Sequence, residues 1–208
     1  MKKSTANSSP ELIQEVHADS ILFSMPTIAG DVLEYEIPSK VSFENAPVFH
    51  EDEWCQLQFF TTSRFEDITE RLTAYKAFEL ENRTTSGWRD LYVRDIPQDS
   101  FKVSVHMLAR LEGAKVQSAP ILTTSSQPIG QVQNGFTIKF DDGMFLYGLE
   151  QKGSIISLAA SVHSDEGNQI LTNTFMAIDK IESLILVDWR NQMIILGGQD
   201  GKLGVWQP

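Results

Sequence analysis

The chain has 208 residues, of which 41% are hydrophobic and 10% aromatic, so it carries enough apolar material for a folded core. Its formal net charge of -11 disfavours binding to phosphate backbones and to anionic membranes. We therefore expect neither nucleic acid nor membrane as a partner. Its one cysteine, Cys55, excludes an internal disulfide and a cysteine-based zinc site and favours a cytoplasmic location.

Most of the net negative charge lies in the N-terminal half of the chain. Residues 1–100 contain 18 acidic and 9 basic residues, whereas residues 101–208 contain 10 and 8. An acidic surface attracts basic proteins and speeds the encounter with them, although it also serves solubility alone. This asymmetry favours another protein, of basic character, as the partner.

The first ten residues, MKKSTANSSP, are polar and predict a disordered tail. We expect residues 11–208 to form a single α+β domain, with an acidic, helix-containing lobe (11–97) and a β-rich lobe (100–208) as an alternative organisation. The two N-terminal lysines precede no apolar segment, and no run approaches the roughly 18 apolar residues of a membrane span. Neither a signal peptide nor a spanning helix is predicted.

Two segments of the first half alternate with the period of a β-strand. In Val32–Ile37, the residues Leu33, Tyr35 and Ile37 point one way and two glutamates the other, which predicts a half-buried strand. Trp54–Phe60 is the second predicted strand, and a loop of acidic residues leads into it.

The clearest helix of the sequence covers residues 63–82. Ser63 and Glu66 match a capping box, in which the two side chains satisfy free backbone donors at the start of a helix. Asp67 and Arg71 are spaced for an ion pair on the helix surface. Apolar residues recur at intervals of three and four and predict one buried stripe: Phe65, Ile68, Leu72, Tyr75 and Phe78.

We expect the second half to be rich in β-meanders. Residues 170–178 are ambiguous between helix and strand, and their Thr and Phe content favours strand. The fold class is therefore α+β, with one long amphipathic helix (about 63–82) packed on a predominantly antiparallel sheet. The order of the strands in that sheet is not predicted. The strands predicted in this half are 101–111, 136–140, 144–149, 155–162, 170–178, 184–189, 193–196 and 202–206.

The segment VFHEDEWCQLQFF, residues 48–60, places four titratable residues in a row before a tryptophan and the cysteine. Residues 50–53 do not predict a metal site, because successive side chains of an extended chain point to opposite sides and cannot converge on one cation. Cys55 lacks a neighbouring base and has acidic neighbours, which favours a buried structural role over a nucleophile. We therefore predict no catalytic residue, metal ligand or cofactor.

An acidic contact surface is the remaining interpretation of this segment. Aromatic side chains and arginine beside charged residues are typical of interface hot spots, although tryptophan is more often buried and its charged neighbours then only cover the edge of a core. The predicted partner-binding residues are Glu51, Asp52, Glu53, Trp54, Trp88, Arg89 and Tyr92.

Three functions are compatible with these features. The leading hypothesis is a non-enzymatic protein-binding protein, such as an immunity- or inhibitor-like protein that masks a basic partner surface with its acidic N-terminal half. The first alternative is an enzyme of unrecognised type with a pocket between helix 63–82 and the sheet. The second is a structural or assembly subunit of a phage or secretion particle, built by pairing of sheet edges. The identity of the partner and the oligomeric state are left open.

Overall fold

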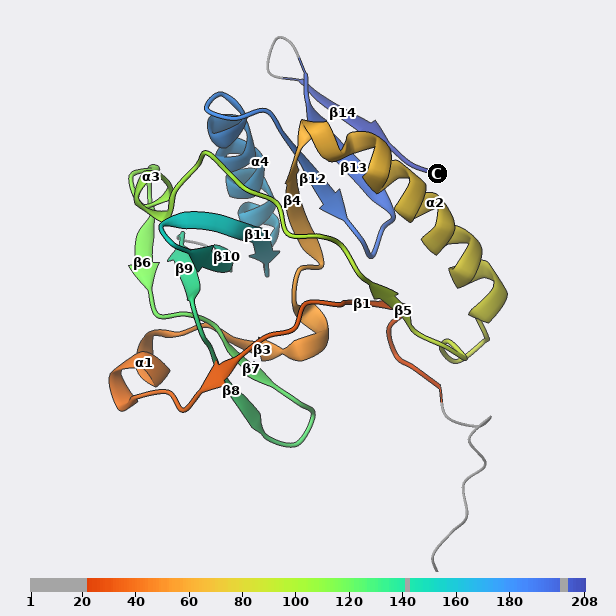
Figure 1. Ribbon diagram of the computed structural model, residues 1–208, viewed down its shortest axis with the longest axis horizontal. Coiled ribbons are helices and arrows are strands. Elements are labelled where there is room, and N and C mark those ends of the chain that lie inside the picture. The colour runs from red at the N-terminus through yellow and green to blue at the C-terminus, as the bar shows by residue number, and fades with distance from the viewer. Residues whose placement is uncertain (1–21, 141–142, 199–201) are drawn as a thin grey trace, which may run out of the picture.

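One large antiparallel sheet organises the protein, as a computed structural model of residues 22–140, 143–198 and 202–208 shows (Figure 1). Its eight strands follow the order β14-β13-β12-β4-β11-β10-β9-β6, and every neighbouring pair is antiparallel. The expected α+β class with a predominantly antiparallel sheet is confirmed, and the predicted tail lies outside the described residues. The strands are β4 (Leu57–Thr61), β6 (Lys115–Gln117), β9 (Gly135–Lys139), β10 (Met144–Gln151), β11 (Ser154–Val162), β12 (Leu184–Asp188), β13 (Met193–Gly197) and β14 (Leu203–Trp206).

Strand β4 joins the two halves of the chain. It lies between β11 and β12, so that Phe59 is paired with Leu158 on one side and with Leu186 on the other. Among the described strands of the large sheet, β4 alone comes from the first hundred residues. The N-terminal and C-terminal halves therefore share one sheet.

One face of the large sheet is covered by helix α4 (Asp165–Asp179), with the short helix α3 (Val105–Leu108) beside it (Figure 1). Successive residues of a strand point to opposite faces, so alternate positions belong to this core. Here Leu171 and Phe175 of α4 join one apolar cluster with strand residues such as Leu158. This cluster is the largest of the three in the protein.

The opposite face is divided between a helix and a second sheet. Ile68 and Leu72 of α2 (Phe65–Asn82) pack with Phe60 of β4 and Ile185 of β12. Farther along the same face lies a four-stranded sheet of order β2-β8-β7-β3, whose cluster includes Tyr147 of β10. Its strands are β2 (Tyr35–Glu36), β3 (Val48–His50), β7 (Ile121–Thr123) and β8 (Pro128–Val132).

A two-stranded parallel ribbon and a short helix complete the fold. Strand β1 (Thr27–Ala29) pairs with β5 (Tyr92–Arg94), and α1 (Lys40–Asn45) precedes β3. No helix within the described ranges is both long and apolar enough to cross a membrane.

Helix α2 confirms the longest predicted element but begins differently from the prediction. A single turn of 3-10 helix, η3 (Thr62–Arg64), precedes it, and no side chain caps its first turn. The Ser63 hydroxyl instead lies 2.7 Å from the Thr61 hydroxyl, so the predicted capping box is wrong. The predicted surface pair is present: Arg71 Nε lies 2.7 Å from Asp67 Oδ1.

Residues 170–178 form most of helix α4, so the preference for strand is wrong. The hydroxyl of Ser164 accepts a hydrogen bond from the Gly167 amide at 3.0 Å and caps the helix start. Leu171, Phe175 and Ile178 then recur at helical spacing and are all buried. The cap and this spacing outweigh the strand propensity of threonine and phenylalanine.

The predicted strand over residues 101–111 is also wrong, because Ser104 caps the short helix α3 by accepting from the Met107 amide. The alternating segment 32–37 is a strand only at Tyr35–Glu36. Leu33 and Tyr35 do pack into the core, but Ile37 is 96% exposed because the segment leaves the sheet before Pro38. The hairpin of β9 and β10 and the final β12–β14 meander are confirmed.

Two leucines of helix α2 give a matched test of its packing. Leu72 is fully buried against the large sheet, whereas Leu80 is 64% exposed on the same helix. We expect Leu72→Ala to lower the free energy of unfolding by about 2–5 kcal/mol, because it leaves a cavity. Leu80→Ala should change it by less than about 0.5 kcal/mol. Urea denaturation of both variants measures the difference, and similar values for the two would contradict this packing.

Candidate functional site

The acidic segment predicted from the sequence forms a tight turn on the surface. It is the 3-10 turn η2 (Glu51–Glu53), hereafter the acidic turn, which follows β3 directly. His50 Nδ1 accepts a hydrogen bond from the Asp52 amide at 3.2 Å. Glu51 is exposed, whereas Asp52 and Glu53 are half-buried. Glu53 Oε1 lies 2.5 Å from Arg190 Nη2, so Glu51 is the carboxylate that this turn presents most openly.

A buried tyrosine fixes the end of the acidic turn. The Tyr147 hydroxyl accepts a hydrogen bond from the Cys55 amide at 2.9 Å and donates one to the Glu53 carbonyl at 3.2 Å. Cys55 adopts a φ of 55°, in the left-handed region that non-glycine residues rarely occupy. Its thiol is fully buried, and burial raises its pKa, so the predicted burial of this cysteine is confirmed.

Arg94 of β5 holds the backbone of the two residues that follow the acidic turn. Its guanidinium donates to the carbonyls of Trp54 and Cys55 at 3.4 and 3.1 Å, and to the Thr27 hydroxyl at 3.1 Å. It also stacks over the ring of Trp189, 5.1 Å from the ring centroid. Burial lowers the pKa of Arg94 to about 10, which still leaves it protonated at neutral pH.

Trp54 does not occupy the exposed position that the sequence predicts. Its side chain is only 3% exposed and packs against Tyr147, with ring centroids 5.1 Å apart. Its Nε1 donates a hydrogen bond to Asp31 Oδ2 at 3.0 Å. The prediction of Trp54 as an exposed contact residue is wrong, because the chain reverses at Cys55 and turns the indole into the core.

The other predicted contact residues lie in a separate region at the C-terminal end of α2 (Figure 1). Trp88 is half-buried, and its backbone forms a bridge with Phe23. Tyr92 is half-buried and stacks on Tyr75, with ring centroids 5.2 Å apart. Arg89 is exposed. The structure does not join these residues to the acidic turn, and their role in binding a partner stays a prediction.

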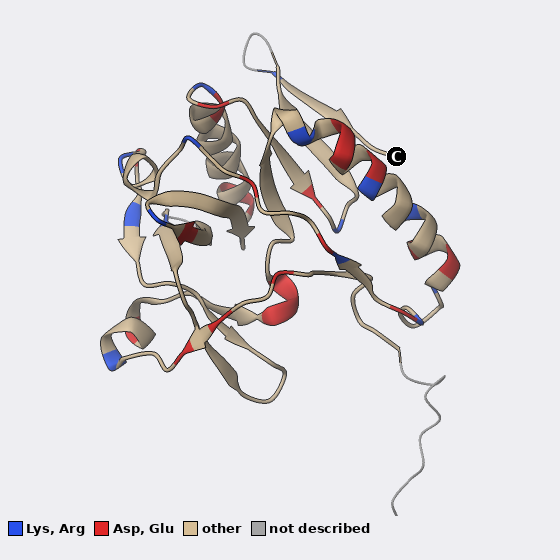
Figure 2. Ribbon diagram, in the orientation of Figure 1, with Lys and Arg blue, Asp and Glu red and all other residues tan. Residues whose placement is uncertain are grey.

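A second acidic segment surrounds β2, at the edge of the four-stranded sheet opposite to β3 and the acidic turn that follows it. Burial, and secondly the negative charge of Glu51, raise the pKa of Tyr35 in β2. Glu34 and Glu36 flank this tyrosine and are exposed. Figure 2 shows acidic residues both in the acidic turn and along the chain entering β2. We call Glu34, Glu36, Glu51 and Asp52 together the acidic face.

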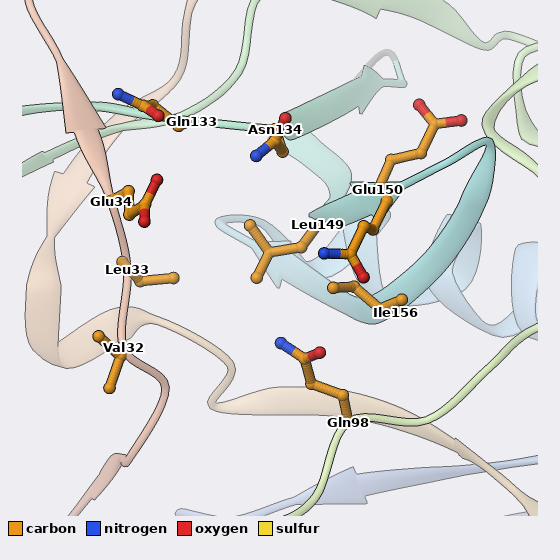
Figure 3. A pocket seen from close by; sticks show the side chains of 10 residues that line it. Val32, Leu33, Glu34, Gln98, Gln133, Asn134, Leu149, Glu150 and Ile156 are labelled. Atoms are coloured by element: carbon orange, nitrogen blue, oxygen red, sulfur yellow. The ribbon is translucent and has the colours of Figure 1, made fainter.

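A pocket of about 220 Å³ lies beside this face (Figure 3). Leu33 and Leu149 point toward one another across it, and Gln98 reaches into it from below in this view. We call it the acidic cleft, because the described residues that line it include two glutamates but no Lys, Arg or His. Its lining consists of Val32, Leu33, Leu149 and Ile156, of Glu34 and Glu150, and of Gln98, Gln133, Asn134 and Gln151.

The arrangement offers negative charge rather than a metal centre or a nucleophile. In the described part of the chain, no three His, Cys, Asp or Glu side chains come together as ligands of one metal ion. His50 Nε2 has a hydroxyl neighbour, Ser125 Oγ, at 3.4 Å on an exposed site. The chemistry that these side chains support is the binding of positively charged groups.

Sequence reasoning did not find the buried supports of the acidic turn or the acidic cleft. Arg94, Tyr147 and Asp31 are distant from the turn along the chain, so their contacts are visible only in the fold. The signal that the sequence does offer is the two-residue spacing of Tyr92 and Arg94, which places the arginine on the same side of an extended segment as an aromatic residue.

Comparisons of the chain with protein-family models, with curated proteins and with solved structures find no match. The class of protein is therefore argued from the fold and the acidic face alone.

Replacing Arg94 should destabilise the protein more than replacing any exposed arginine. Arg94→Met keeps an apolar stem but leaves the buried carbonyls of Trp54 and Cys55 without these donors. We expect the free energy of unfolding to fall by about 3 kcal/mol. Arg89→Met is the matched control, because Arg89 is exposed, and should cost less than about 0.5 kcal/mol. Equal unfolding curves for the two variants in urea would contradict the role of Arg94.

Replacing the carboxyl group of Asp31 should raise the stability of the protein in a pH-dependent way. Burial raises its pKa, while the hydrogen bond from Trp54 and the charge of Arg94 act in the opposite direction. A raised pKa means that the folded state binds the proton more tightly, so ionised Asp31 destabilises the fold at neutral pH. We expect Asp31→Asn to melt at a higher temperature than the wild type at pH 7. The difference should shrink as the pH falls toward about 4, where the carboxyl becomes protonated. Circular dichroism melts measure this, and a lower melting temperature of the variant at pH 7 is the contrary result.

Proposed function

We propose that this protein binds another protein and masks a basic surface of it with the acidic face, as an immunity- or inhibitor-like protein would. The observation that carries the proposal is the rigid mounting of an exposed acidic turn. The buried hydroxyl of Tyr147 donates to the Glu53 carbonyl of the turn, and Tyr147 and Arg94 hold the backbone of Trp54 and Cys55 directly after it. A preorganised turn loses little conformational entropy on binding, so its charge contributes to affinity and specificity.

Charge distribution supports the same proposal. Glu34, Glu36 and Glu51 are exposed, and no ion pair holds their side chains within the described residues. Exposed, unpaired carboxylates produce a negative potential that steers a basic partner toward them. The effect weakens with salt, because mobile ions screen exposed charges.

Exposed apolar side chains flank two of these carboxylates along the chain. Val32 is 95% exposed and Ile37 is 96% exposed, on either side of Glu34 and Glu36. Protein interfaces combine apolar contacts with charged residues at their rim, so exposed valine and isoleucine are expected of a contact surface. The acidic face therefore offers both kinds of contact to a protein partner.

The alternative of an enzyme required a pocket between helix 63–82 and the sheet. Apolar side chains occupy that interface: Ile68, Leu72 and Tyr75 of α2 are fully buried and pack in one cluster with Val187 and Trp189. The structure thus gives this version of the enzyme hypothesis no geometric support.

A pull-down from cell lysate at two salt concentrations tests the masking function. We expect the wild type to capture a basic protein at about 0.1 M salt and to release it near 1 M, as the screening length falls from about 10 Å to about 3 Å. Glu36→Gln with Glu51→Gln should abolish the capture, because it removes two exposed charges of the acidic face.

The matched control replaces two exposed glutamates of helix α2, Glu70→Gln with Glu81→Gln, and changes the net charge equally. It should retain the partner. Capture that does not depend on salt, or an equal loss of capture in the control variant, would contradict the masking function. Circular dichroism establishes that both variants are folded.

A further inference from the structure

Strand β14 forms one rim of the large sheet (Figure 1). Within the described residues it has a single neighbouring strand, β13. The Gly198 amide donates to the Lys202 carbonyl at 2.8 Å, and hydrogen-bonded pairs alternate with non-bonded pairs along an antiparallel ladder. Gly204 is therefore bonded to β13, whereas Leu203 and Val205 direct their backbone N–H and C=O groups away from it.

This rim lacks the features that normally keep strand edges apart. Exposed edges are commonly protected by charged side chains, by proline or by a bulge. The sequence of β14 is LGVW, and its register with β13 is regular, so it has none of these features. At the opposite rim, β6 is only three residues long and carries Lys115. Of the two rims of the large sheet, the β14 rim is therefore the one open to another strand.

The exposed side chains of β14 are apolar and lie on one face of the sheet. Val205 is 61% exposed and Leu203 is 37% exposed. Val205 lies opposite Ile195, which packs against the apolar cluster beneath α4, so both exposed residues belong to the α4 face. A strand added to this rim would cover apolar surface as well as satisfy the outward backbone groups.

We propose that β14 pairs antiparallel with β14 of a second copy of this protein, about a two-fold axis at Gly204. In this register Leu203 lies opposite Val205 of the second copy and exchanges both backbone hydrogen bonds with it. The exposed valine of each copy thereby contacts the exposed leucine of the other. A second copy fits this rim because the outward groups are placed symmetrically on either side of Gly204, as a two-fold interface requires.

The flanking residues agree with the same register, which places Lys202 opposite Trp206 of the second copy. Trp206 lies on the α2 face, where its ring meets that of Phe65 edge to face at 6.4 Å between centroids. Alternation along the chain directs Lys202 to the same face. An ammonium against an indole ring is a favourable contact, so the lysine beside the strand meets an aromatic ring rather than a like charge. Because both copies use the same rim, the association closes at a dimer.

Sedimentation equilibrium of the full chain tests the dimer. The contact involves one short strand, so we expect a weak dimer with a Kd on the order of 100 µM. Val205→Lys should be monomeric even at several times that concentration, because it puts a charge on the paired rim. The matched control is Val116→Lys in β6, where the valine is 65% exposed, and it should dimerise like the wild type.

Melting temperatures establish that both lysine variants are folded. A wild type that stays monomeric in the millimolar range overturns the proposal. A dimer that persists in Val205→Lys, or that is lost equally in Val116→Lys, overturns it as well.

Gly204→Cys tests the position of the two-fold axis. A residue on the axis faces its own copy in a non-hydrogen-bonded pair, with Cα atoms about 4.5 Å apart, a distance that a disulfide spans. The added Cβ meets nothing closer than the Leu196 Cβ at 3.8 Å, so we expect the variant to fold. Mild oxidation should convert it to a covalent dimer, whereas Val116→Cys should remain monomeric. Cys55 is fully buried in both variants. Failure of Gly204→Cys to cross-link, or equal cross-linking of the two variants, would contradict the pairing.

Discussion

Burial of a single guanidinium constrains much of this structure. Among the described residues, Arg94 is the one basic side chain counted as buried, and it stays protonated even with its pKa lowered to about 10. A buried charge must be surrounded by acceptors, or the fold loses several kcal/mol. The carbonyls of Trp54 and Cys55 both converge on Nη2, and the Thr27 hydroxyl faces Nη1. The ribbon of β1 and β5 is thereby tied to the backbone that leads from the acidic turn into β4.

The elements that the sequence predicts well are those specified by neighbouring residues. Helix α2 follows from apolar residues at intervals of three and four, and the strands β9 and β10 follow from alternating apolar residues in two neighbouring segments. The burial of Cys55 follows from the same kind of reasoning, since a cysteine at the entrance of an apolar strand is normally part of a core. These predictions need no knowledge of which segments meet in space.

Long-range contacts decide the features that the sequence does not show. Trp54 looks like an exposed aromatic beside acids, but Asp31 and Tyr147, from distant segments, provide its hydrogen bond and its packing surface. Ile37 continues a strand pattern yet is exposed to solvent, since the pairing of β2 with β8 ends at Glu36. The acidic cleft is assembled from five separate stretches of chain, among them those of Leu33 and Gln98. The spacing of residues along the sequence carries no information about such long-range contacts.

The position of β4 has a consequence for the synthesis of the chain. Both of its neighbours, β11 and β12, are made long afterwards, because Phe59 pairs with Leu158 and Leu186. A growing chain therefore carries β4 with two unpaired edges while it emerges from the ribosome. Pairing over such distances is slow, and exposed strand edges invite association between chains. Within the described large sheet, the five-residue strand LQFFT at its centre is thus the strand that waits longest for its neighbours.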